Sequence, residues 1–182
     1  MTNVYAEAQI PAGSSNYLKF NKPETTFRIL DEPIMGTLGW FNRKPIRKRI
    51  GEAINVSEVD DPSEIKYFWA MPVFDYEDKE IKILEITQKS ILKAIKSYAN
   101  DEDYGNPTGY DIKVTGTGEG LERRYLVTPK PPKKLDPAII QLYKDMEINL
   151  DALFDGADPF KASEQKKEDD FVDEVSKAID EV

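Results

Sequence analysis

Short stretches rich in apolar, β-branched and aromatic residues run through most of this chain, a pattern typical of β-strands. The stretches expected to form strands are 25–41, 66–76, 80–86, 110–114 and 122–128, of which 110–114 alternates strictly between apolar and polar residues. Residues 66–76 are apolar at both odd and even positions, so we expect both faces of this strand to be covered. Turns at 77–79 and 116–120 join the later stretches into two hairpins.

The first strand, 25–41, is expected to bend at Gly36 and Gly39, because positions without a side chain tolerate a bend. A polar connection follows at 43–56, with room for one short strand. A loop at 60–64 then contains an Asp-Pro turn.

Two segments have the spacing of amphipathic helices. The first spans 87–100, with Thr87 as the expected N-cap. The second begins with Asp136 as N-cap and Pro137 as its first residue. Their apolar residues are Ile91, Leu92, Ile95 and Tyr98 in the first, and Ile139, Ile140, Tyr143 and Met146 in the second. Between them, the prolines of 129–134 predict an extended segment.

The order of these elements, without alternation of strand and helix, predicts a mainly β protein that forms a small barrel. An OB-fold, a five-stranded Greek-key barrel, fits this order best, because the helix at 87–100 separates its last hairpin from the rest. SH3-like and split barrels fit less well. We divide the chain into an N-terminal arm at 1–19, an OB-fold domain at 20–135, and a C-terminal part at 136–182 with a helix, a linker at 154–163 and an acidic tail. The residues expected in the barrel core are Ile83, Ile91, Leu92, Ile95, Ile112 and Val114.

The amino-acid inventory removes many kinds of site. The 182 residues include no Cys and no His, which excludes zinc fingers, thiol nucleophiles and Ser-His-Asp triads. We therefore expect no metal, no cofactor and no catalysis. No apolar run approaches the ~20 residues of a membrane span, and the N-terminus lacks the layout of a signal peptide, so we expect a cytoplasmic protein.

Charge is distributed unevenly along the chain. The net charge is −9, yet residues 1–135 are neutral overall and 136–182 carry all the excess acid. Within the neutral part, a cluster of cations directly follows two aromatic residues. The cluster consists of Trp40 and Phe41, then Arg43, Lys44, Arg47, Lys48 and Arg49. A basic groove that holds phosphates, with aromatic rings that stack on bases, is typical of single-strand binding. The alternative is a solvated basic loop with Trp40 in the core.

Two hairpins supply further candidate nucleic-acid contacts. On residues 66–76, Tyr67 and Trp69 share one face, and only one face of a barrel strand points to the interior. On the last hairpin, cations that could extend a basic track accompany one aromatic residue. These residues are Lys113, Arg123, Arg124 and Tyr125. The GTGEG sequence at 116–120 lacks the Lys-Ser/Thr ending of a phosphate loop, so we interpret it as a hairpin tip.

Two other classes of function stay open. Asp75, Glu80 and Lys82 have the spacing of a Mg²⁺-dependent nuclease, in which carboxylates hold the metal and a lysine orients water. A charged strand edge is the simpler interpretation of these residues. An acidic adaptor that mimics DNA is the third class, against which the neutral body and the tight basic cluster argue.

Several motifs together resemble a group of bacteriophage single-stranded DNA-binding proteins over about residues 16–135. The motifs are NYLKF, FRILDEPIMGTLGWF, YFWAMPVFDY, IKILEITQKSI and YDIKVTGTGEGLERRYLVTPKPPKKL. The resemblance implies one OB-fold followed by an acidic tail, and a non-catalytic role in phage replication and recombination. It implies no structural zinc, because this chain has no Cys or His.

The sequence thus predicts a sequence-independent single-stranded DNA-binding protein that acts in the host cytoplasm. Residues 164–182 hold eight acidic residues against three lysines, so we expect this tail to compete with phosphates for the basic groove. A stripe of apolar residues on the tail has helical spacing and is expected to bind replication or recombination proteins. The stripe consists of Phe171, Val175, Ile179 and Val182. A plain solubilising tail is the alternative.

Overall fold

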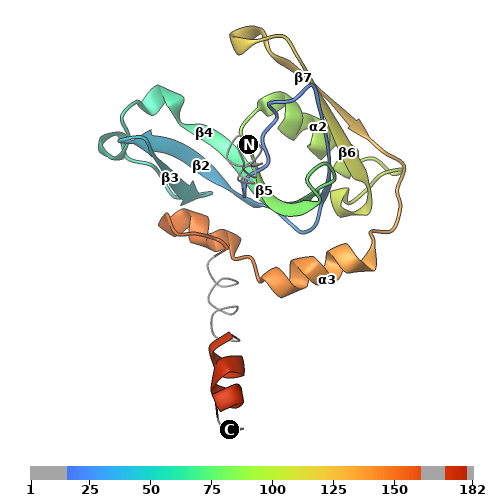
Figure 1. The fold of residues 1–182 in the computed structure, drawn as a ribbon. Helices are drawn as coiled ribbons and strands as arrows, with labels where there is room; N and C mark the ends of the chain where they lie inside the picture. The colour runs from blue at the N-terminus through green and yellow to red at the C-terminus, as the bar shows by residue number, and fades with distance from the viewer. Residues whose placement is uncertain (1–15, 161–170, 180–182) are drawn as a thin grey trace, which may run out of the picture.

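A computed structural model describes residues 16–160 and 171–179, and its main feature is one seven-stranded sheet (Figure 1). The strands are β1 (Glu24–Ile29), β2 (Ile34–Phe41), β3 (Lys44–Arg49), β4 (Lys66–Asp75), β5 (Glu80–Ile86), β6 (Asp111–Thr117) and β7 (Arg124–Pro129). The helices are α2 (Lys89–Ala99) and α3 (Pro137–Met146), with short 3₁₀ turns η1 (Val56–Glu58), η2 (Pro62–Glu64), η3 (Pro107–Gly109), η4 (Gly120–Glu122) and η5 (Leu150–Asp155). All pairings between these strands are antiparallel, which confirms a mainly β protein.

Strand β4 organises the sheet. One edge of β4 pairs first with β2 and then with β1, and the other edge pairs with β5 along most of its length. The sheet runs in the order β3-β2-β4-β1-β6-β7, with β5 on the free edge of β4. The strand is buried on both faces from Ala70 onward, as its apolar pattern predicts.

The long first strand is interrupted, but not where the glycines predict. The break falls at residues 30–33, where Pro33 lacks a backbone donor and the Asp31 carboxylate accepts from the backbone of Glu32 at 2.8 Å. Gly36 and Gly39 lie inside β2, where neighbours approach closely. A Cβ at Gly36 would lie 2.2 Å from the Lys48 oxygen. The two glycines therefore permit close packing within β2, whereas the interruption of the predicted strand lies at residues 30–33.

The basic segment after β2 forms a tight hairpin. Asn42 and Arg43 both have positive φ, 50° and 65°, as a two-residue type I′ turn requires. The short strand foreseen within 43–56 is β3, which pairs with β2 along its whole length. The loop at 60–64 contains η2, and Asp61 caps it by accepting from the backbone of Ser63 at 2.9 Å.

Helix α2 lies against one face of the sheet, and the core residues foreseen from the sequence are all buried. The N-cap is Gln88 and not Thr87, because the helix starts one residue later than predicted. The Gln88 side chain instead accepts from the Thr87 backbone at 3.2 Å. Ile83 belongs to a second core on the opposite face of the sheet, apart from the other predicted core residues.

No strand-to-strand pairing joins β5 to β7 among the described residues, so the sheet does not close into a barrel by its strands. Residues 16–23 cross the gap instead. Leu18 donates its backbone N–H to Ile83 at 2.9 Å, and Ile83 donates back to Asn16 at 2.9 Å. Leu18 is buried together with Phe27 and Met71 in the core between α2 and the sheet, which we call the first core. The end of the predicted N-terminal arm is therefore an integral part of the body.

Residues 154–160 do not form the predicted linker; residues 161–163 lie outside the described chain. Leu153 and Phe160 are 3% and 4% exposed, and they cover the second core. That core contains Leu38, Phe68, Ala70 and Ile83. The backbone of Asn149 donates to Pro159 at 2.9 Å, which closes the segment into a compact loop. This role could not be predicted from the sequence, because the apolar residues of 150–160 are interspersed with Asp and Gly and have no regular periodicity.

Helix α3 begins as predicted, with Asp136 accepting from the backbone of Ala138 at 2.9 Å and Pro137 in the first turn. The Tyr143 hydroxyl donates to Asp31 at 2.9 Å, and this contact ties α3 to the β1–β2 bend. The proline-rich segment before α3 is held by the fully buried Arg28, which contacts Asp111 at 3.2 Å and the oxygen of Lys133. No helix of the described residues is long and apolar enough to cross a membrane.

Candidate nucleic-acid interface

The aromatic residues predicted to bind nucleic acid lie on two opposite faces of the sheet. In the strand register, Leu38 lies opposite both Arg47 and Lys66, and Trp40 lies opposite Pro45. Paired residues share a face and neighbouring residues alternate. Trp40, Arg47 and Lys66 therefore share one face, the Trp40 face. Tyr67 and Trp69 point to the other, the Trp69 face.

Two adjoining hollows on the Trp40 face form a groove around Trp40. Their volumes are about 250 and 440 Å³, and both are lined by Lys19, Trp40 and Glu85. The smaller hollow adds Phe20 and Lys66, and the larger adds Tyr17, Lys44 and Arg47. We call this the Trp40 groove. Trp40 is 42% exposed within it, so one ring is accessible from both hollows.

Three lysines around this groove are free to bind an anion. Lys19, Lys44 and Lys66 are exposed and form no ion pair with the described residues. Lys19 lies over the Tyr17 ring, with its Nζ 5.8 Å from the ring centre. Burial raises the pKa of Tyr17 above its usual value, although the charge of Arg47 opposes the shift. The groove thus combines aromatic faces with uncompensated positive charge.

The other cations of the basic cluster have acidic partners. Arg47 Nε lies 2.7 Å from Glu85, and both side chains are largely buried. Lys48 lies 3.8 Å from Glu58, and Arg49 lies 3.5 Å from Asp151. The Arg49 guanidinium also stacks 4.4 Å above the Phe154 ring. These contacts fasten the hairpin to the body, and of the five cations only Arg43 and Lys44 stay unpaired among the described residues.

On the Trp69 face, a hydrogen bond joins the side chains of Trp69 and Tyr67. The Trp69 Nε1 donates to the Tyr67 hydroxyl at 2.9 Å, and that hydroxyl lies 3.3 Å from the Met35 sulfur. Trp69 is half-buried against the first core and Tyr67 is 41% exposed. Phe41, 44% exposed, shares this face at the tip of the β2–β3 hairpin.

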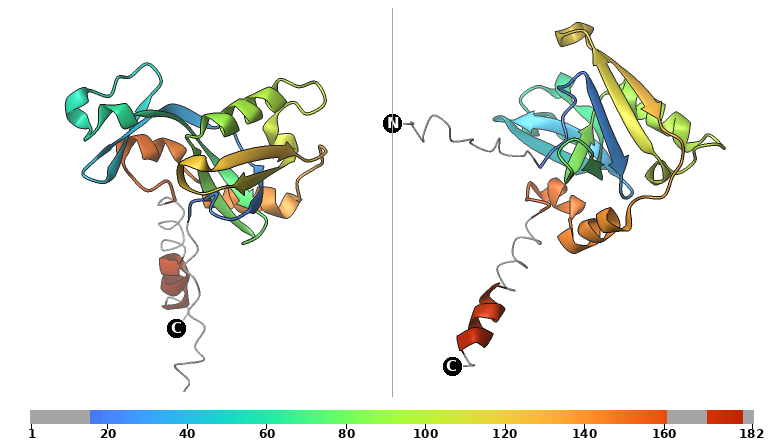
Figure 2. Two further views of the ribbon diagram at one scale, coloured as in Figure 1. Left: turned by 90° about the horizontal axis from the view of Figure 1, so that it is seen from above. Right: turned by 45° about the vertical axis from the view of Figure 1, so that its right-hand side comes forward.

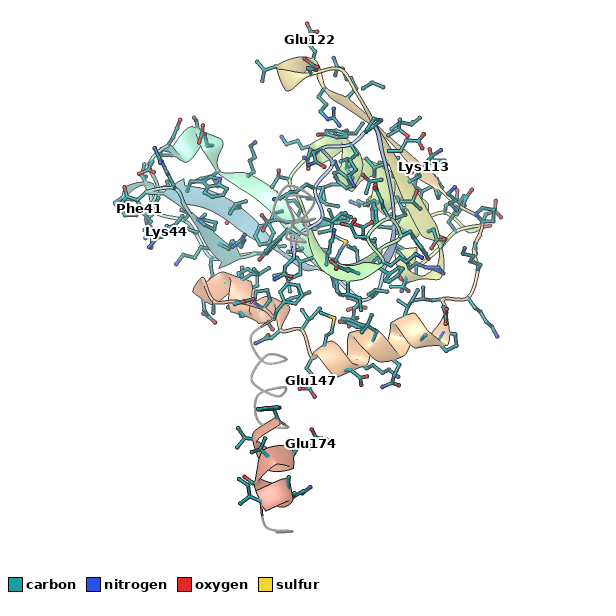
Figure 3. All side chains as sticks on the ribbon, in the orientation of Figure 1. Phe41, Lys44, Lys113, Glu122, Glu147 and Glu174 are labelled. Carbon is teal, nitrogen blue, oxygen red and sulfur yellow. The ribbon has the colours of Figure 1, made fainter. Side chains whose placement is uncertain are left out.

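The last hairpin does not extend the basic cluster. Figure 3 places Lys113 on β6, on the opposite side of the molecule from Phe41 and Lys44. Lys113 lies 3.9 Å from Glu24. Arg123 has all its donors turned inward, to the carbonyl oxygens of Phe20, Lys22 and Gly118 and to the hydroxyl of Tyr125. Arg124 is exposed and unpaired among the described residues, and Glu122 marks the hairpin tip (Figure 3).

Four aromatic and basic lining residues are not among the predicted site residues: Tyr17, Lys19, Phe20 and Lys66. The motif NYLKF contains three of them, and it was used for the resemblance but not as part of the site. The signal available in the sequence was the interleaving of aromatic and basic residues in that motif. Lys66 stands at the start of β4, and only the strand register brings it next to Trp40.

The residues that suggested a nuclease form a buried ion pair. The Lys82 ammonium lies 2.9 Å from Asp75 and also binds Asp78. Burial opposes the charged form of Lys82, but its bonds to Asp78 and Asp75 keep its pKa above the usual value. Glu80 is exposed, and no cluster of acidic side chains within 16–160 and 171–179 is suited to hold a metal ion. Asp75 and Lys82 thus form an ion pair with each other.

The predicted partner-binding stripe lies only partly within the described chain. Residues 171–179 are helical, and Phe171, Val175 and Ile179 are 66%, 43% and 68% exposed. Val182 and most acidic residues of the tail lie outside the described residues. The prediction that the tail competes for the groove therefore stays a prediction.

Comparison with known proteins gives no relative: no family model matches this chain, and no curated protein or solved structure is significantly similar to it.

Proposed function

We propose that this protein binds single-stranded DNA without sequence preference in the Trp40 groove. One observation carries the proposal: an exposed Trp40 ring lies between two hollows lined by unpaired lysines. Base stacking on an aromatic ring is sequence-tolerant because every base has a π-face. Lysines bind phosphates through charge and do not read sequence.

The groove assigns a role to each of its residues. Trp40 stacks on one base, and Tyr17 and Phe20 offer further aromatic surface on the same side. Lys19, Lys44 and Lys66 neutralise the phosphates that flank these bases. Glu64 and Glu85 also line the groove, and they limit its net positive charge. We therefore expect moderate affinity with a clear dependence on salt.

The topology is consistent with an OB-fold whose gap between β5 and β7 is filled by residues 16–23. This arrangement supports the sequence resemblance to phage single-stranded DNA-binding proteins, and with it a non-catalytic role in phage replication and recombination in the host cytoplasm. In this proposal the exposed Phe171, Val175 and Ile179 bind a replication or recombination protein. The ion pair between Asp75 and Lys82 favours this function over that of a nuclease.

Fluorescence of a variant with one tryptophan tests the proposal. The chain has two tryptophans, so Trp69→Phe leaves Trp40 as the only reporter, and Trp40→Phe is the matched control. We expect oligo-dT to quench Trp40 fluorescence, duplex DNA to quench it far less, and the control to respond weakly. Trp40→Ala should weaken binding by about 1–3 kcal/mol.

Equal quenching by duplex and single-stranded DNA would contradict the proposed preference for single strands. Unchanged affinity in Trp40→Ala would show that the DNA-binding site lies outside the Trp40 groove. Oligonucleotide loss that depends on Mg²⁺ would support a nuclease instead. A poly-U oligonucleotide of the same length compares RNA with DNA, because discrimination between them needs contacts to the 2′-hydroxyl.

A further inference from the structure

A hollow of about 490 Å³ opens on the Trp69 face, apart from the Trp40 groove. It lies between the β1–β2 bend and the carboxyl end of α2. Trp69, Met71 and Ile95 provide an apolar floor, and Asp31 and Glu32 stand at its rim. Met71 and Ile95 are almost fully buried, so the hollow reaches down to the first core.

The charge around this hollow decides what kind of group can enter it. Among the described residues, neither Lys nor Arg lines it, and Asp31 and Glu32 are both acidic. Ala99, the last residue of α2, also lines it, so the negative end of the helix dipole adds to the carboxylates. A phosphate or the acidic tail would be repelled. An apolar group that carries a positive charge would fit.

The β2–β3 turn of the same protein presents such a group. Phe41 is 44% exposed, and Arg43, two residues later, is exposed and unpaired among the described residues. Two hydrogen bonds to Asp60 hold the turn. The Asn42 backbone N–H donates to the Asp60 carboxylate at 2.8 Å, and the Asp60 backbone N–H donates to the backbone oxygen of Trp40 at 2.8 Å. A preformed projection loses little conformational entropy when it binds.

We propose that Phe41 and Arg43 of one copy enter the Trp69 hollow of a second copy. Phe41 packs on the apolar floor, and Arg43 pairs with Glu32 at the rim. The contact goes beyond the proposed DNA binding and does not depend on it.

The hollow and the projecting turn lie at opposite ends of β2. Met35, near the start of this strand, lines the hollow, and Phe41 is the last residue of the strand. At ~3.3 Å per residue, Met35 and Phe41 are about 20 Å apart along the strand. Such a contact either closes reciprocally between two copies or leaves one free hollow and one free turn, to which further copies add as a row. Trp40 points to the face opposite Phe41, and the Trp40 groove therefore stays accessible in a row.

Sedimentation of the full chain without nucleic acid tests the contact. We expect the average mass to rise above the 20.8 kDa of one chain as concentration increases. Arg43→Glu and Glu32→Arg should each weaken the association by about tenfold, and the double variant should restore it, because the charges are exchanged. Arg124→Glu and Glu80→Arg are charge-matched controls at exposed positions elsewhere, and they should have no effect.

A mass of one chain at all concentrations would overturn the proposal, and so would a double variant that is as weak as the single ones. Crosslinking provides an independent readout, because the chain has no native cysteine. A mixture of Arg43→Cys and Glu32→Cys proteins should form disulfide dimers faster than either protein alone, and equal rates would contradict the contact. Tighter oligo-dT binding by Glu32→Arg with unchanged mass would assign the hollow to nucleic acid and overturn the proposal as well.

Discussion

The guanidinium of Arg123 donates a hydrogen bond of 3.0 Å to the main-chain oxygen of Phe20, across 103 positions of sequence. The same group reaches the oxygens of Lys22 and Gly118. Gly116 makes this possible, because a Cβ there would lie 2.3 Å from the Arg123 Nη2. Together with the backbone bond from Gly116 to Pro23 at 2.9 Å, this one side chain fastens the segment 16–23 to the last hairpin.

Arg123 and Arg124 are neighbours with different expected roles, and alanine variants should separate them. Arg123→Ala should lower the free energy of unfolding by about 2–3 kcal/mol, because charged hydrogen bonds to carbonyl oxygens are lost. Arg124→Ala should change stability by less than about 0.5 kcal/mol, since its side chain is exposed and unpaired. Urea denaturation of both variants measures the difference. Equal destabilisation would contradict the assigned role of Arg123.

Salt dependence of oligo-dT binding should follow the unpaired lysines of the Trp40 groove. Replacing Lys19, Lys44 and Lys66 together by Ala should reduce the slope of log K against log salt by up to about two units, at ~0.7 per phosphate contact. Titrations at several salt concentrations measure this slope. Lys48→Ala is the control, because Lys48 already pairs with Glu58. A slope that is unchanged in the triple variant would place the phosphates elsewhere.

Leu153 should be as important for stability as a residue of the first core. Leu153→Ala should cost about 2–5 kcal/mol, because it opens a cavity over Phe68 and Ala70. Val175→Ala, on the exposed helix at 171–179, should cost less than about 0.5 kcal/mol. Thermal unfolding of both variants compares them.

Two truncations examine the same boundary. A chain that ends at residue 163 should unfold at the same temperature as the full chain, whereas one that ends at residue 148 should be unstable and aggregate, because the second core is then exposed. Equal stability of both truncations would contradict the packing of residues 150–160.

Stability should decrease in alkaline solution, and Tyr110 should contribute to the decrease. Burial raises the pKa of Tyr110 from 10.0 to about 12, so the folded protein holds this proton more tightly than the unfolded chain does. The contribution of Tyr110 is complete below pH 10 and is lost as the pH rises towards 12, by at most about 1.4 kcal/mol per pH unit. Denaturation of Tyr110→Phe should show a shallower loss above pH 10 than the native chain. Burial also raises the pKa of Tyr76 and Tyr143, so part of the loss should persist.

The sequence predicts the elements of this fold well where apolar spacing is regular. The strands around β4, helix α2 and the N-cap of α3 all follow from local patterns. The break at residues 30–33 was misplaced because a glycine signals either a bend or a close approach, and only the neighbouring strand decides which. The packed segment at 150–160 was missed because its apolar residues contact partners on β2, β4 and β5, which are far away in the sequence.

The candidate site was predicted in part for a related reason. The basic cluster after Trp40 is visible in the sequence, but the partners of its cations are not. Arg47 pairs with Glu85, which lies on β5, and the pairing turns a predicted phosphate contact into a structural ion pair. Register also separates Trp40 from Trp69, although both belong to aromatic strands of the same sheet. Spacing along one strand cannot reveal which acid lies across from a given cation.

The segment 16–23 has a consequence for how the chain is synthesised. It precedes every strand of the sheet in the chain, yet the residues that hold it, Ile83, Gly116 and Arg123, are synthesised long afterwards. Leu18 can bond to β5 once Ile83 has left the ribosome, whereas Phe20 and Pro23 must wait for the last hairpin. The segment is therefore completed in two stages during translation, and its second half becomes native only after residue 123 has been added.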